Sequence, residues 1–169
     1  MSHFKFILPV KTYIRKYIEA NYGEPTFIDL STDIGFTILN TLASRLESKI
    51  GRGNIDIFQN RFVDKVEFKI PFHYLSLTKR EVSPQTIVLL NRLLENKFDH
   101  DMNSFITNSR VPYGTQIKTG IEIFTSNNNI ELEVDVTFEA LSKSLYRYRQ
   151  TLGKKSSRKL SKERTRAIA

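Results

Sequence analysis

The sequence predicts an α+β protein with a small antiparallel sheet and helices, followed by a helical C-terminal segment and a basic tail. Two observations predict this class. In the first 110 residues, short stretches with an apolar residue at every second position alternate with longer stretches of helical spacing. Residues 115–152 show mainly the helical spacing, and basic residues then replace most apolar ones. We therefore expect an α+β body over 1–110, a helical module over 115–152 and a basic tail over 153–169.

The composition limits the class of protein. Apolar residue types make up 40% of the 169 residues, which is enough to build a hydrophobic core. The absence of cysteine excludes a disulfide framework, a thiolate zinc site and a cysteine nucleophile. The apolar runs are too short to cross a bilayer, and the N-terminus lacks the features of a signal peptide. We therefore expect a cytoplasmic protein, or one within a phage particle, that does not bind a membrane.

The first fifty residues predict one strand and two helices. Residues 4–10 form an apolar run that predicts a strand. Residues 13–18 then carry apolar and aromatic residues at helical spacing, and the glycine and proline that follow end this helix. A second helix begins after an N-cap at Ser31 or Thr32 and ends in a turn at 51–54. Its apolar stripe has a four-residue spacing: Ile34, Ile38, Leu42 and Leu46.

Two strands and a long helix are predicted in the rest of the body. Residues 55–58 and 66–74 have the composition of strands, and the second of them alternates apolar and polar side chains. Pro71 cannot donate to a β-ladder, so this strand lies at the edge of the sheet or ends there. Ser83 is an N-cap followed by proline, and it predicts a helix that extends to about residue 107.

Three helices are predicted after a break in the chain at 111–114. Thr115 caps the first helix, which a polar turn at 126–129 ends. Residues 130–134 predict a short helix of one or two turns. Thr137 then caps a longer last helix. The buried face of this last helix follows from offsets of three and four residues: Phe138, Leu141, Leu145, Tyr148 and Leu152.

The opposite face of the last helix combines positive, aromatic and amide side chains: Lys143, Tyr146, Arg147 and Gln150, with Ser142 and Arg149 beside them. Arginine pairs with guanine, glutamine with adenine, and hydroxyl groups with phosphate. This combination therefore indicates a nucleic-acid-binding face. The alternative is that residues 117–152 form a helical hairpin of the core, in which Tyr146 and Tyr148 pack instead of contacting nucleic acid.

A short helix before a longer basic helix is the helix-turn-helix layout, in which the second helix enters the major groove of DNA. In this respect residues 115–152 are similar to the tri-helical, homeodomain-like helix-turn-helix modules of small phage and mobile-element DNA-binding proteins. The resemblance implies that the last helix is the recognition helix. It also implies that the acidic middle helix, at 131–135, lies away from the phosphate backbone.

The net charge of +8 is concentrated at the C-terminus. Residues 141–169 contain ten basic residues and one acidic residue, whereas residues 1–140 contain sixteen basic and seventeen acidic ones. This asymmetry is typical of contact with nucleic acid or another anionic surface, and a charge run can also be a solubilising tail. Because this run follows a patterned helix, we expect its basic residues to bind phosphates: Lys154, Lys155, Arg158, Lys159, Lys162, Arg164 and Arg166.

The candidate catalytic and metal-binding residues do not form a recognisable site. Asp99, His100 and Asp101 are adjacent on a predicted helix, where successive side chains point about 100° apart and cannot converge on one metal ion. We expect them to form a solvated helix face. The sequence has no Ser-His-Asp spacing, paired-carboxylate motif or glycine-rich phosphate loop. We therefore expect a protein that is not an enzyme and uses no cofactor or metal ion.

The sequence favours a DNA-binding protein that uses a C-terminal helix-turn-helix and a basic tail. Its body would form a homo-oligomer or dock onto an assembly partner. One alternative is a structural protein of a phage or another assembly, whose basic tail contacts packaged nucleic acid. Another is an RNA-binding or ribosome-associated protein. The mixture of arginine, tyrosine and glutamine on one helix favours DNA binding, because a lysine-rich tail alone would suit the alternatives equally.

Overall fold

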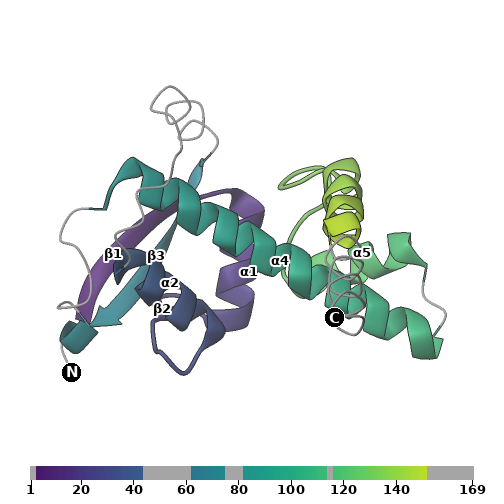
Figure 1. Ribbon diagram of the computed structural model, residues 1–169. Helices are drawn as coiled ribbons and strands as arrows, with labels where there is room; N and C mark the ends of the chain where they lie inside the picture. Colours follow the sequence, from purple (N-terminus) through teal and green to yellow (C-terminus); the bar gives the residue numbers. More distant parts are fainter. Residues whose placement is uncertain (1–2, 44–61, 75–81, 114–115, 152–169) are drawn as a thin grey trace, which may run out of the picture.

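A computed structural model describes residues 3–43, 62–74, 82–113 and 116–151 of the chain (Figure 1). Its elements follow in this order: β1 (His3–Val10), α1 (Thr12–Tyr22), β2 (Thr26–Phe27), α2 (Asp33–Ala43), β3 (Asp64–Pro71), the 3-10 helix η2 (Phe72–Tyr74), α4 (Pro84–Tyr113) and α5 (Ile117–Asn127). A last helix covers residues 138–151. The predicted α+β class is confirmed.

The strands form one mixed sheet in the order β1-β3-β2. β1 and β3 are antiparallel, as expected, and Phe6 lies opposite Phe68 in their register. β2 pairs with β3 in parallel through Thr26 and Phe27, so the sheet is mixed and not antiparallel throughout. Two residues are too few to show an alternating pattern, which is why the sequence does not predict β2.

β3 ends at Pro71, three residues before the end of the strand predicted over 66–74. Pro71 has no N–H group to donate to the ladder. The next residues form η2, in which Phe72 is 51% exposed. β3 lies between β1 and β2. The prediction that the strand ends at the proline is therefore confirmed. The alternative, that this strand lies at the edge of the sheet, is wrong.

The hydrophobic core lies on one face of the sheet and continues into the helices. Alternate residues of β1 and β3 point into it: Phe6, Leu8, Val10, Val66, Phe68 and Ile70. α1, α2 and α4 bury apolar residues in the same cluster. The predicted N-caps are confirmed for α2 and α4. Thr32 Oγ1 accepts a hydrogen bond from the Gly35 N–H (3.1 Å), and Ser83 Oγ accepts one from the Thr86 N–H (3.2 Å).

α4 is 30 residues long and extends well past the sheet, and α5 lies beside its far half (Figure 1). The prediction that this helix ends near residue 107, before a break at 111–114, is wrong, because the helix continues through Pro112 to Tyr113. Proline removes one intrahelical hydrogen bond, and here that loss falls in the last turn. The core is continuous across the expected break, with the rings of Phe98 and Phe124 in edge contact at 5.4 Å.

The middle helix predicted at 130–134 is absent, and a hydrogen-bonded loop replaces it. Asp135 Oδ2 accepts hydrogen bonds from the Glu131 N–H and from Lys16 Nζ of α1, both at 2.7 Å. Glu133 has a positive φ of 67°, which interrupts a right-handed helix. The loop keeps one helical-type hydrogen bond, from the Asp135 N–H to the Glu131 carbonyl (2.9 Å), and its acidic side chains bind further backbone and α1 groups.

α5 also differs at both ends from the prediction. Its N-cap is Gln116, one residue after the predicted Thr115, and the helix continues through Asn127 into the expected polar turn. The turn itself is formed by Asn128 and by Asn129, which has a φ of 56°. Asparagine tolerates this left-handed conformation, as a tight turn requires. Several predicted features lie outside the described residues: Leu46, the turn at 51–54, the strand at 55–58, Thr115, Leu152 and the tail at 153–169.

Candidate nucleic-acid interface

The last helix is fixed at its start and along its apolar face. Thr137 Oγ1 accepts a hydrogen bond from the Ala140 N–H (3.2 Å), which confirms Thr137 as the N-cap. Leu141 and Leu145 are 3% and 2% exposed in the core, and Phe138 packs against the core while partly exposed. This part of the predicted apolar stripe is therefore confirmed.

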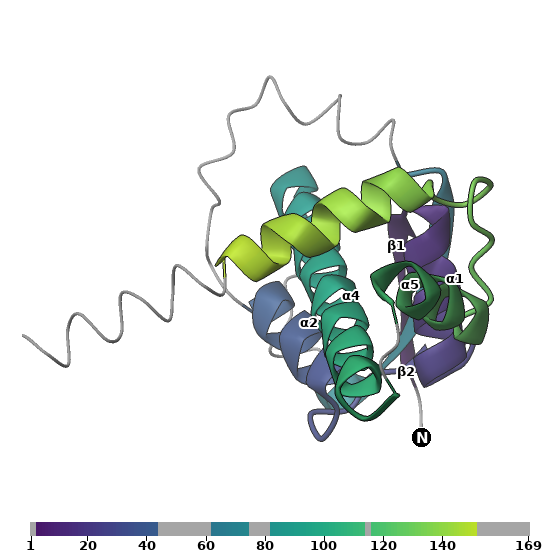
Figure 2. The ribbon, with the colours of Figure 1, turned by 90° about the vertical axis from the view of Figure 1, so that its right-hand side faces the viewer.

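Polar side chains also attach the last helix to α4, across which it lies (Figure 2). The hydrogen-bonded pairs are Ser144 Oγ to Asp99 Oδ2 (2.7 Å), Tyr148 OH with His100 Nδ1 (2.9 Å) and Arg149 Nε to Asn103 Oδ1 (2.7 Å). These pairs restrict the rotation of the last helix about its own axis, because they join two of its turns, at Ser144 and at Tyr148 with Arg149, to α4. The side chains on the opposite face consequently have defined directions.

The prediction that Asp99, His100 and Asp101 form a solvated helix face is wrong for Asp99 and Asp101, which are half-buried, whereas His100 is exposed. Asp99 and His100 bond to the last helix, and Asp101 accepts a hydrogen bond from Tyr17 of α1. The three side chains therefore point to separate partners, as their spacing around the helix requires. Within the described ranges, no group of histidine, cysteine or acidic residues is arranged to hold a metal ion.

Most of the predicted binding residues on the last helix are exposed. Lys143, Tyr146, Arg147 and Gln150 are exposed together, and Tyr146 has a 64% exposed side chain. Gln150 Nε2 donates a hydrogen bond to Tyr146 OH (2.8 Å). We call these four residues the exposed face. Ser142 and Arg149 are half-buried beside it. Tyr148 is also half-buried, so of the two tyrosines of the alternative hairpin reading only Tyr148 packs against α4.

The two cations of the exposed face differ in their partners. Lys143 Nζ lies 2.6 Å from Glu139 Oε1, and this contact lowers the pKa of the Glu139 carboxyl below its ordinary value. Glu139 was not among the predicted site residues, although its i,i+4 spacing to Lys143 is the signal for such a pair. No carboxylate of the described residues forms an ion pair with Arg147. Arg147 is therefore the cation of this face that is available to an anionic ligand.

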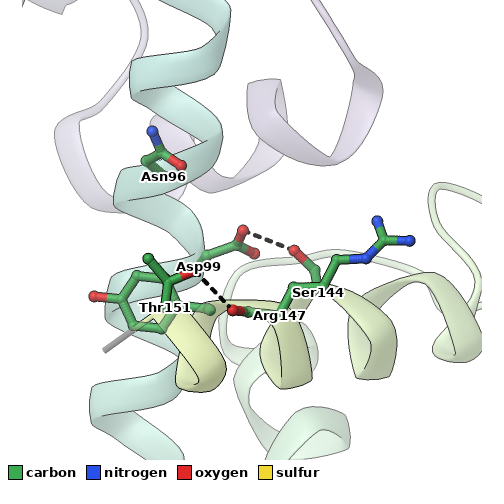
Figure 3. Close-up of a pocket in the computed structure, with 6 residues that line it drawn as sticks. Asn96, Asp99, Ser144, Arg147 and Thr151 are labelled. Atoms are coloured by element: carbon green, nitrogen blue, oxygen red, sulfur yellow. Dashed lines mark hydrogen bonds between the residues drawn. The ribbon is translucent and has the colours of Figure 1, made fainter. Parts of the chain in front are cut away.

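A cleft of about 500 Å³ opens where the last helix crosses α4 (Figure 3). Six residues line it: Asn96, Asp99, Ser144, Arg147, Tyr148 and Thr151. The Asp99 carboxylate turns toward Ser144, whereas the Arg147 side chain points away from Asp99 (Figure 3). Burial raises the pKa of the Asp99 carboxyl, against the opposing effect of the Ser144 hydrogen bond. Sequence reasoning missed this cleft, because its two walls come from helices about 45 residues apart in the chain.

Comparison of the chain with protein-family models, with curated proteins and with solved structures found no match. Its function is therefore inferred from the placement of its own side chains. Among the helices of the described residues, none has both the length and the apolar content needed to cross a lipid bilayer.

Proposed function

We propose that the protein binds DNA through the exposed face of the last helix and the basic tail that follows it. The observation that carries this proposal is the division of the last helix into two faces. Leu145 and Ser144 hold one face against the core and α4, while Arg147 lies exposed on the other. A helix held in this way presents its side chains at fixed positions, which favours contact with regularly spaced phosphates and base edges.

The chemistry of the exposed face suits DNA in three ways. Arg147 offers a planar guanidinium that can bind guanine or phosphate through two parallel hydrogen bonds. Gln150, about one turn along, offers the amide that pairs with adenine, and its hydrogen bond to Tyr146 gives it a defined orientation. Tyr146 adds an aromatic ring and a hydroxyl group. The tail then supplies seven basic residues for phosphates, with one acidic residue among them.

The proposal keeps a shorter helix before the basic last helix, but not the tri-helical module, because its middle helix is absent. α5 and the last helix supply the two outer helices, and the loop replaces the middle helix of the tri-helical modules that the sequence resembles. The acidic residues of the loop support this arrangement. Lys16 of α1 lies 3.4 Å from Glu131 and 2.7 Å from Asp135, so their negative charge is directed toward α1.

The test compares Arg147→Ala with Lys65→Ala, a control that removes an exposed cation from β3. Fluorescence anisotropy measures the binding of each protein to a duplex selected from a random pool and to a scrambled duplex, across a salt series. We expect Arg147→Ala to lose about 1–3 kcal/mol of binding free energy on the selected duplex and less on the scrambled one. Lys65→Ala should bind like the wild type.

Three results would contradict parts of this proposal. Equal losses on both duplexes would remove the recognition role of the last helix and leave a purely electrostatic contact. Tighter binding to RNA of the same sequence than to DNA would favour the RNA-binding alternative. No binding of the wild type to any nucleic acid at low salt would overturn the proposal in favour of an assembly protein.

A further inference from the structure

The cleft between α4 and the last helix contains opposite charges that do not neutralise each other. Asp99 and Arg147 both line it, yet they form no ion pair within 4 Å. Asp99 Oδ2 accepts one hydrogen bond from Ser144, and a carboxylate has about four acceptor positions, so it can accept further hydrogen bonds. A ligand that fits here must therefore present a hydrogen-bond donor to Asp99 and an anionic group to Arg147.

The remaining lining residues narrow the class of ligand. Tyr148 contributes an aromatic ring, against which a planar base can stack. Asn96 and Thr151 add an amide and a hydroxyl group, which suit a sugar. The volume of about 500 Å³ lies in the range of small-molecule sites and is sufficient for one nucleotide. Simple inorganic anions do not fit, because the Asp99 carboxylate would repel them.

We propose that this cleft binds one unpaired nucleotide whose base carries an exocyclic amino group. The amino group donates to Asp99, the base stacks on Tyr148, and the phosphate binds Arg147. This inference rests on the proposed function, which makes a nucleotide the relevant ligand. It adds a base preference that contact with the phosphate backbone alone does not provide, since the backbone is the same in every sequence.

The sharpest test uses cytidine and uridine monophosphates, which have the same charge, sugar and phosphate. They differ at ring position 4, where cytosine has an amino donor and uracil a carbonyl acceptor, and at the neighbouring N3, which accepts in cytosine and carries a hydrogen in uracil. Titration calorimetry should give binding of the cytidine nucleotide at least about tenfold tighter, because the uracil carbonyl oxygen at position 4 would face a carboxylate that can only accept hydrogen bonds. Oligo-dC and oligo-dU strands of equal length then show whether the nucleotide binds free or within a strand.

Substitution of Asp99 tests the assignment of the amino group. In Asp99→Asn the side-chain oxygen can still accept from Ser144, while the new NH₂ group offers a donor to uracil. The preference for cytosine should disappear or reverse. Glu122→Gln, an exposed carboxylate-to-amide change on α5, should keep the preference. Arg147→Ala should weaken both monophosphates equally and leave the phosphate-free nucleoside cytidine unaffected.

The possible results separate this inference from the proposed function. Equal binding of the two monophosphates by the wild type overturns the inference, as does an unchanged cytosine preference in Asp99→Asn. If duplex DNA still binds through Arg147 in those cases, the proposed function stands. A cytosine preference in free monophosphates without binding to any DNA would support the cleft and contradict DNA binding.

Discussion

Glu139 is the acidic side chain next to the exposed face, and it holds Lys143 at 2.6 Å. The substitution Glu139→Gln removes its charge and leaves Lys143 available to a phosphate. We expect a several-fold higher affinity for DNA, and a plot of log affinity against log salt that is steeper by about one unit. Anisotropy titrations across a salt series measure both quantities. Glu122→Gln also releases a lysine, on α5, and should change neither.

Asp99 also makes folding stability depend on pH. Burial raises its pKa in the folded protein, so the folded state binds the proton more tightly than the unfolded state does. Its contribution to the free energy of unfolding is therefore most favourable below the ordinary aspartate pKa and is lost as the pH rises through the raised value. Asp99→Asn lacks this titration, so the stability of the variant relative to the wild type should increase with pH across that interval. Thermal melts of both proteins at matched pH values test this, and a constant difference would contradict it.

At the scale of elements, the two faces of the last helix predict opposite consequences of substitution. Leu145→Ala removes a side chain that is 2% exposed, so it should lower the free energy of unfolding by about 2–5 kcal/mol. Tyr146→Ala, one residue further on, changes an exposed side chain and should alter stability by about 0.5 kcal/mol or less. Denaturant unfolding of both variants measures these changes in the free energy of unfolding. DNA titration of Tyr146→Ala should show weaker binding despite the intact fold.

The sequence predicts those elements that carry a long periodic pattern. β1 and α1 form close to their expected positions, and α2 and α4 begin close to theirs, because repeated apolar residues must reach a common core. The periodic pattern of apolar residues does not predict the structure where polar side chains bond to the backbone or to distant helices. Asp135, for example, helps to close a loop through contacts with Glu131 and Lys16, and local helical spacing does not reveal Lys16 as its partner.

The candidate site is predictable in part for the same reason. The exposure of Lys143 and Arg147 follows from the apolar stripe on the other face of the same helix. The bond from Arg149 to Asn103 and the cleft depend on how two helices cross, which no single-helix pattern contains. Adjacent polar residues on α4 such as Asp99 and His100 therefore look solvated in the sequence and bond to another helix in the fold.

At the scale of the whole molecule, the basic tail and the last helix should contribute differently to binding. Deletion of residues 154–169 removes seven cations and only two large apolar residues, so thermal melting should change little. Affinity should fall equally for selected and scrambled duplexes, with a flatter dependence on salt. Anisotropy titrations beside a melting curve test this. Loss of folded protein on truncation would show instead that the tail is structural.

α5 and the last helix are attached to the rest of the molecule in two ways: they pack on α4, and the turn and loop between them form polar contacts with α1. α4 spans about 45 Å at 1.5 Å per residue, so a tilt of roughly 5° at its sheet end would move its far end by about 4 Å. α1 forms a brace against this movement, because Asn21 Nδ2 donates to Asn128 Oδ1 (2.6 Å) and Lys16 binds Asp135. These two contacts of α1 keep the exposed face at a constant angle to the sheet. If the exposed face binds DNA as proposed, the orientation of the sheet therefore sets the direction of the bound DNA.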